Sequence, residues 1–342
     1  MAKQAERDSY FDNAKLLLMI LVVLAHGMEI TGSTGGVAAA VYRLIYLFHM
    51  PAFIFITGYF SARQKRVEVG DLIGQYLLFQ VLFSLESHLL KAGTPVGFTL
   101  TFTTPVWILW FTLSCIIWKL AAPVAVRLPL PAVMGLLVLA ALLAGYDTAI
   151  GYYLSLSRTV VFFTFFMLGY FTKDEWLRRL RQIPAYTGLA VFALAFFMLW
   201  YLPPLPKQLL YGSVPYGALG YTAWYAGGYR LLVLLCGFVL LAAFFICVPR
   251  GRHFFTSFGT RTLPVYYLHG LLLQALRAYL PPLLGGSPWK AALFYLCLPA
   301  LVFVFSAKPV AVLLYPLLRP WHCIQKGTAL ICKGKARPKT EE

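Results

Sequence analysis

Ten runs of mostly apolar residues dominate this chain of 342 residues. A helix needs about 20 such residues to cross the hydrocarbon core of a bilayer. Because 60% of the residues are hydrophobic and only 12% are charged, a water-soluble core could not bury them all. The sequence therefore predicts an all-α, polytopic integral membrane protein with about ten transmembrane helices. The runs cover residues 13–31, 37–61, 70–90, 104–122, 130–146, 151–172, 184–203, 228–248, 259–280 and 291–318.

These runs leave little room for a separate soluble domain. We expect residues 1–318 to form one membrane domain and residues 319–342 to form a basic cytoplasmic tail along the anionic inner leaflet. The last run is long and contains Pro299 and Pro309, which predicts a kinked or tilted helix.

The net charge of +17 is explained mainly by topology. If the N-terminus is cytoplasmic, 20 of the 29 Lys and Arg residues fall in inner segments. Only three fall in outer loops, namely Lys91, Lys207 and Lys290. This bias follows the positive-inside rule and predicts a multi-pass protein of the cell membrane with both termini in the cytoplasm. A nucleic-acid partner is not predicted.

The six cysteines include no CxxC pair, and four of them lie within the apolar runs. In that setting cysteine behaves as a small hydrophobic residue. The sequence therefore predicts neither a disulfide framework nor a metal site.

The first apolar run carries three ionisable residues on one predicted helix face. Lys15 and His26 are eleven positions apart, which corresponds to three turns plus about 20° and a rise of about 16 Å. Glu29 follows His26 by three positions and shares its face. A histidine beside a carboxylate is a plausible general base. The alternative is a hydrogen-bonded histidine with a structural role.

Other polar residues inside the predicted spans are functional candidates, because each is costly in lipid. They are His49, which precedes a proline by two positions, and Glu86, Arg158 and His269. Arg230 and Arg277 lie near span ends, where we expect their side chains to reach the headgroups.

A basic cluster directly follows the second run. Arg63 and Arg66 are three positions apart and would share a face if the helix continued. Guanidinium groups suit phosphates, although inner loops are generally rich in arginine.

Several segments resemble the membrane acyltransferase 3 family. The run from Arg7 to Lys15, followed by LLLMILVVLAHG, is similar to the start of that family, in which a basic residue precedes a histidine at the spacing of Lys15 and His26. FHMPAFIFITGYF (48–60) resembles its second signature, and Arg63 and Arg66 match its Arg-x-x-Arg element. SRTVVFFTFFMLGYF (157–171) and GTRTLPVYYLHG (259–270) resemble the branch of fucose 4-O-acetylases and related acetyltransferases.

The resemblance implies O-acylation of a carbohydrate or similar hydroxyl on the outer face. The donor would be cytoplasmic acyl-coenzyme A, with acetyl the expected acyl group and succinyl the alternative. No permanently bound cofactor is implied. Since the chain shows no appended outer domain of the hydrolase kind, we expect acceptor specificity to come from loops.

The resemblance also suggests roles for the candidate residues. The coenzyme A phosphates would be held by Lys15, Arg63 and Arg66. Lys15 is also expected to be a catalytic residue. His26 would take the hydroxyl proton, with Glu29 or Glu86 orienting its ring, and a transient acyl-enzyme is the alternative route. Polar contacts to donor or acceptor are expected from His49, Glu86, Arg158 and His269.

A multi-pass transporter of a small solute or glycan precursor is the competing interpretation. Intramembrane ionisable residues and proline-broken helices also suit a transporter. A transporter would, however, favour paired halves with matching broken helices, and no such repeat is visible in the sequence. A scaffold without chemistry would leave the ionisable residues in the spans unexplained.

Overall fold

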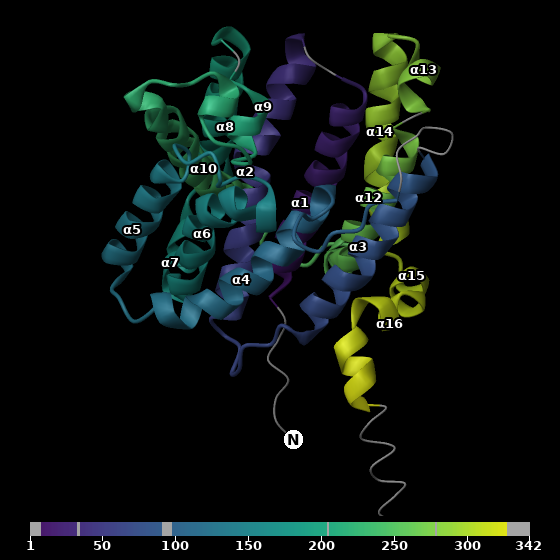
Figure 1. Ribbon diagram of the computed structural model, residues 1–342, viewed down its shortest axis with the longest axis horizontal. Coiled ribbons are helices and arrows are strands. Elements are labelled where there is room, and N and C mark those ends of the chain that lie inside the picture. Colours follow the sequence, from purple (N-terminus) through teal and green to yellow (C-terminus); the bar gives the residue numbers. More distant parts are fainter. Residues whose placement is uncertain (1–7, 33–34, 91–97, 204, 278, 327–342) are drawn as a thin grey trace, which may run out of the picture.

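The computed structural model describes residues 8–32, 35–90, 98–203, 205–277 and 279–326. Every regular element within these residues is a helix, and the helices form one bundle (Figure 1). Six helical segments are long and apolar enough to cross a membrane. They are α1 (Ser9–Ile30), α2 (Gly36–Ser61), η1 (Trp107–Leu109) with α4 (Trp110–Ala125), η2 (Tyr153–Ser155) with α6 (Leu156–Phe171), η4 (Trp224–Ala226) with α10 (Gly227–Cys247), and α14 (Pro288–Phe305).

The remaining apolar runs also form helices, so the prediction of an all-helical polytopic membrane protein is confirmed. α7 (Asp174–Gln182) and α8 (Ala185–Tyr201) meet at an angle of 83° and count as a seventh span if taken together. Others are α3 (Gly70–Leu90), α5 (Leu130–Leu143) and α12 (Thr262–Leu276). Short helices complete the fold: α9 (Lys207–Leu210), α11 (Thr256–Gly259), α13 (Leu280–Leu284), α15 (Lys308–Leu313) and α16 (Tyr315–Leu318).

The prediction of one helical span over residues 291–318 is wrong. α14 ends at Phe305, and Ala307 is extended. Pro309 lies in the first turn of α15, where its missing N–H leaves no helical hydrogen bond unmade. α15 and α16 therefore form separate short helices below α14 in Figure 1.

Two glycines let α2 and α6 approach closely. A Cβ atom on Gly58 would lie 2.0 Å from the carbonyl oxygen of Phe166, and one on Gly169 would lie 2.1 Å from that of Phe55. Small residues at such crossings allow membrane helices to pack backbone against backbone. This contact fixes α6 beside α2 and positions the side chains that both helices direct into the bundle.

The N-terminal half of α1 is fixed by polar contacts. The amide of Asn13 donates hydrogen bonds to the carbonyls of Pro249 and Gly251, at 2.9 and 2.8 Å. The absence of a side chain on Gly259 lets α11 lie against the α1 backbone at Asp12. These contacts set the rotation of α1, and therefore the direction of its polar face.

Arg230 of α10 does not reach the headgroups as expected. The residue is 1% exposed, and its guanidinium donates to the carbonyls of Ala141, at 3.1 Å, and Val214, at 2.9 Å. It also lies over the ring of Tyr216. Because buried carbonyls need hydrogen-bond donors, Arg230 connects α10 to α5 and to the loop before the short helix η3 (Gly217–Leu219).

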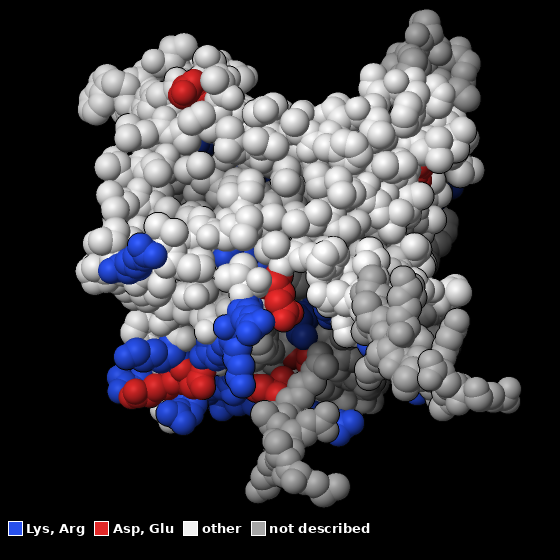
Figure 2. All heavy atoms as spheres, turned by 60° about the horizontal axis from the view of Figure 1, so that its bottom comes forward, with Lys and Arg blue, Asp and Glu red and all other residues white. Residues whose placement is uncertain are grey.

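The charged side chains gather at one end of the bundle. Figure 2 shows Lys, Arg, Asp and Glu concentrated along the lower edge, beneath a surface almost without charge. The start of α1 and the end of α16 lie toward this same end (Figure 1). Lys91, the first seven residues and the tail beyond residue 326 lie outside the described residues.

Candidate active site

Two hollows meet inside the bundle at Lys15. We call the first, with a volume of about 250 Å³, the central cavity. We call the second, about 750 Å³ at the charged end, the basic chamber. Lys15 lines both, and His26 lines the central cavity further along the same helix. α1 is continuous from Ser9 to Ile30, so the predicted shared face of Lys15 and His26 leads from one hollow into the other.

The basic chamber contains four cations and three carboxylates. Lys15 pairs with Asp12 at 2.7 Å, and Arg181 pairs with Asp8 at 2.7 Å. The complete lining is Asp8, Phe11, Asp12, Lys15, Tyr59, Phe60, Arg63, Asp174, Leu177, Arg178 and Arg181. Of these cations, Arg178 has no ion pair with any carboxylate in the described part of the chain.

Arg63 lies in the basic chamber, where it is paired with Asp174 of α7 and stacks over the ring of Tyr59. Tyr59 also donates a hydrogen bond to this carboxylate at 2.6 Å. The hydrogen bonds from Tyr59 and Arg63 hold the pKa of Asp174 below its usual value, because they stabilise its charged form.

Arg66 does not join Arg63. The expected continuation of α2 beyond the membrane span is absent, since α2 ends at Ser61 and a turn follows. Arg66 is exposed and outside both hollows. The prediction that Arg63 and Arg66 share a helix face is therefore wrong.

Three histidines from different helices converge on the central cavity. His26 of α1 and His49 of α2 line it, whereas His269 of α12 is fully buried behind His26. The rings of His26 and His269 are nearly parallel, with Nδ1 of the former 3.1 Å from Nε2 of the latter. Among the described residues, no three His, Cys, Asp or Glu side chains gather in a way that could hold a metal ion.

Backbone contacts define the tautomers of the histidine pair. Nδ1 of His269 lies 2.7 Å from the carbonyl of Val265, so this nitrogen must donate. In the neutral pair, Nε2 of His269 then accepts from Nδ1–H of His26. The lone pair of His26 is left on Nε2, for which the described residues provide no hydrogen-bond partner. This is the form that a general base requires.

His49 has a similar arrangement. Its Nδ1 lies 2.7 Å from the carbonyl of Ile45, one helical turn earlier. The nitrogen must therefore donate, and the lone pair of the neutral ring is on Nε2. His49 can thus accept a hydrogen bond from a hydroxyl in the cavity.

The structure places the two expected orienting carboxylates elsewhere. Glu29 lines the central cavity, but it accepts a hydrogen bond from Tyr46 at 3.1 Å and pairs with Arg277 at 3.4 Å. Glu86 lies outside the cavity lining and accepts from Gln274 at 3.0 Å. Neither is the partner of His26 Nδ1, because His269 occupies that position.

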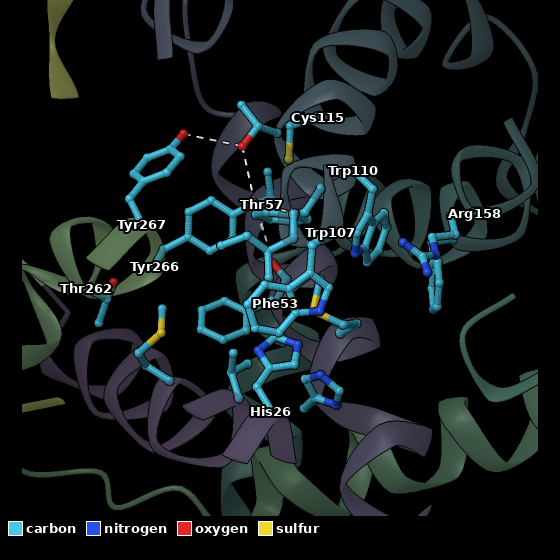
Figure 3. Close-up of a pocket in the computed structure, with 18 of the residues that line it drawn as sticks. His26, Phe53, Thr57, Trp107, Trp110, Cys115, Arg158, Thr262, Tyr266 and Tyr267 are labelled. Atoms are coloured by element: carbon cyan, nitrogen blue, oxygen red, sulfur yellow. Dashed lines mark hydrogen bonds between the residues drawn. The ribbon is translucent and has the colours of Figure 1, made fainter. Parts of the chain in front are cut away.

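Arg158 and a set of aromatic rings form one side of the central cavity (Figure 3). The guanidinium lies 5.1 Å from the ring centre of Trp110, 5.6 Å from that of Tyr152 and 6.0 Å from that of Tyr211. Trp107 packs against His26, with 5.0 Å between ring centres. The cavity therefore combines polar groups with flat apolar surfaces.

Three contributions were not predicted from the sequence. The sequence predicts no site role for Arg178 and Arg181, although the strongly amphipathic DEWLRRLRQ segment indicates a surface helix that places charges together. Arg277 is half exposed, and its ion pair with Glu29 and its position over Trp107 add contacts that the sequence did not predict. No pattern in the sequence places His269 behind His26.

Comparison with known families identifies the chain. The family profile described as an acyltransferase domain, that of acyltransferase 3, matches residues 8–311. Comparisons with curated proteins and with solved structures returned no match. The match covers both hollows and decides between the enzyme and transporter interpretations in favour of an enzyme. The chain belongs to the acyltransferase 3 family of membrane-bound acyltransferases.

Proposed function

We propose that this protein is an O-acyltransferase of the cell membrane that moves an acyl group, acetyl in the first instance, from cytoplasmic acyl-coenzyme A to a carbohydrate hydroxyl. The charged end of the bundle would face the cytoplasm, in keeping with the positive-inside rule. The donor would enter there, and the acceptor would enter from the end that carries Glu29 and Arg277.

The basic chamber supports the donor assignment. Coenzyme A carries its phosphates at one end and its thioester at the other. Four cationic side chains in the chamber can donate hydrogen bonds to those phosphates, namely Lys15, Arg63, Arg178 and Arg181. From Lys15 to His26 the rise is about 16 Å, which is of the order of an extended pantetheine arm. Phosphates held in the chamber therefore allow the thioester to reach the central cavity.

The histidine pair supports the proposed chemistry. Nε2 of His26 accepts the proton of the acceptor hydroxyl while that oxygen attacks the thioester carbonyl carbon. A new C–O bond forms, the C–S bond breaks, and the proton on His26 passes to the departing thiolate. His269 acts as a positioning residue, because its bond to Nδ1 keeps the basic nitrogen of His26 available to the hydroxyl.

The aromatic lining supports a carbohydrate acceptor. Several aromatic side chains line the central cavity, among them Trp107, Trp110, Tyr46 and Tyr211. Sugars present both apolar C–H faces and hydroxyls, which suit flat rings beside polar side chains. Nε2 of His49 and the Glu29 carboxylate offer acceptors for hydroxyls that do not react.

The position of Lys15 relative to His26 is the observation that best supports the proposal. Lys15 lines both hollows, and His26, with its lone pair on Nε2, lies further along the same face of α1.

The test uses inside-out membrane vesicles from cells with and without the protein, supplied with labelled acetyl-coenzyme A. We expect label in envelope carbohydrate only when the protein is present, and none when sealed right-side-out vesicles receive the donor externally. Equal labelling in vesicles without the protein contradicts the proposal.

A further inference from the structure

Arg158 and Arg230, both in helices of the bundle, have opposite surroundings. Arg230 is 1% exposed, and two backbone carbonyls accept its hydrogen bonds. Arg158 also reaches into the bundle, but it has no hydrogen bond and no ion pair within the described part of the chain. The Nε atoms of both arginines are buried without a partner, so the difference lies in the terminal nitrogens, which donate hydrogen bonds in Arg230 alone of the two. Arg230 is therefore accounted for by the fold, whereas Arg158 is not.

An arginine in a membrane helix that has neither a hydrogen bond nor an ion pair needs a functional explanation. A cation within a bilayer is costly, and such residues normally pair with a carboxylate, a carbonyl or a ligand. The groups around Arg158 are the rings of Trp110, Tyr152 and Tyr211, and the Glu29 carboxylate acts on it only from beyond ion-pair distance. Ring faces interact with the flat side of a guanidinium and leave the N–H groups along its edge to bind an oxyanion.

The position of Arg158 associates it with the acceptor rather than with the donor phosphates. Arg158 lies in the first turn of α6, and Thr172, just after this helix, accepts a bond from Arg63 in the basic chamber. Fourteen residues of helix separate the two sites by about 21 Å. The first turn of α6 is instead attached to the loop on the other side, where Ser157 donates to the carbonyl of Gly212.

Arg158 makes no direct contact with the proposed base, although both line the central cavity. Its guanidinium lies against Trp110 and Tyr211, and Tyr46 packs between Tyr211 and His26. In Figure 3, Arg158 stands at the side of the cavity beyond Trp110, away from His26. This arrangement suits a group that holds a remote part of the substrate rather than the reacting carbonyl oxygen.

We propose that Arg158 binds an acidic group, a carboxylate or a phosphate, on the acceptor, and that the acceptor is therefore an anionic saccharide. This inference rests on the proposed function and gives the substrate class of the same cavity. An edge-on guanidinium recognises either oxyanion through paired N–H donors. A neutral sugar would leave Arg158 without an ion pair, so the site discriminates against it.

The test measures binding, which requires no acyl transfer. The full chain in lipid nanodiscs is titrated with methyl glucoside, methyl glucuronoside and glucose 6-phosphate. We expect at least one acidic probe to bind roughly tenfold or more tighter than the neutral one. Arg158→Gln should bring the probes to within about twofold of one another, and Arg158→Lys should retain part of the preference. Lys290→Gln, at an exposed lysine of α14, is the matched control and should keep the full preference.

The inference is overturned if the wild-type protein binds neither acidic probe more tightly than the neutral one. It is also overturned if the preference for an acidic probe survives Arg158→Gln.

A second experiment compares acetyl- and succinyl-coenzyme A as donors. If Arg158→Gln lowers only the use of succinyl-coenzyme A, the anion belongs to the donor, and the acceptor assignment is wrong. Equal loss of transfer to acidic and neutral acceptors would instead mean that Arg158 serves the reacting carbonyl. Binding of acidic probes without any transfer would contradict the proposed function but not this inference.

Discussion

Nδ1 of His26 lies 3.1 Å from Nε2 of His269, and the two rings are nearly parallel. Because the carbonyl of Val265 holds the far nitrogen of His269, the buried ring can only accept from His26 in the neutral pair. The partner of the proposed base is thus a second histidine from α12, 243 positions away in the sequence.

Removal of the acceptor on His269 should impair catalysis without impairing donor binding. In His269→Leu, the lone pair of His26 is no longer fixed on Nε2, and we expect kcat to fall by about 100-fold or more with little change in KM for acyl-coenzyme A. His269→Gln, whose amide oxygen can still accept, should recover part of that loss. The measurement is of kcat and of KM for acyl-coenzyme A in both variants under steady-state conditions. A rise in KM with kcat unchanged would mean that His269 contacts substrate.

Arg178 should contribute to the binding of acyl-coenzyme A, whereas its neighbour Arg179 should not. Arg178 lines the basic chamber without an ion pair among the described residues, whereas Arg179 pairs with Glu175 on the surface of α7. One charge-assisted contact to phosphate corresponds to roughly a tenfold change in affinity. We expect Arg178→Gln to raise KM for acyl-coenzyme A by about that factor and Arg179→Gln to leave it unchanged. Equal effects in both variants would indicate a general charge effect.

Asp174 should compete with the donor for Arg63. The carboxylate pairs with Arg63 but is well exposed, so the pair is weak. We expect Asp174→Asn to lower KM for acyl-coenzyme A by about two- to fivefold. A higher KM would show instead that Asp174 positions Arg63 for the donor.

The same carboxylate gives a pH prediction. Its folded-state pKa is lowered by hydrogen bonds from Tyr59 and Arg63, so the pair persists above the ordinary pKa of about 3.9. It is lost only as the pH falls through the lowered pKa. We therefore expect Asp174→Asn to leave the shape of the KM profile between pH 5 and 8 unchanged. An inflection in that range that disappears in the variant would contradict the lowered pKa.

Substitutions of Arg158 and Arg230 should differ in their effects on stability. Arg230→Met leaves the carbonyls of Ala141 and Val214 without donors, and we expect Tm to fall by about 5 °C or more. Arg158→Gln removes no hydrogen bond of the described fold and should not lower Tm. Thermal unfolding in the same nanodiscs compares them directly. A stable Arg230→Met protein would show that Arg230 does not hold α10 to α5.

Hydrophobic runs predict the helices of this fold well, because each run is long enough for helix formation to be the only way to satisfy its backbone in lipid. The spacing of Lys15 and His26 likewise predicts their shared face, since α1 has no break between them. The helix end at Ser61 and the break before Lys308 depend on local turn geometry, so the predictions for Arg66 and for the last span failed. The partner of His26 depends on how α12 packs against α1, which no local pattern encodes.

The most direct test of the account is the acyl-transfer rate of His26→Gln beside its affinity for acyl-coenzyme A. His253→Gln, at an exposed histidine outside both hollows, is the matched control. If His26 is the general base, the rate falls by about 10²- to 10⁴-fold while the Kd for acyl-coenzyme A and the Tm stay at their wild-type values. A well-folded His26→Gln protein that transfers acyl groups at the wild-type rate would contradict the central claim.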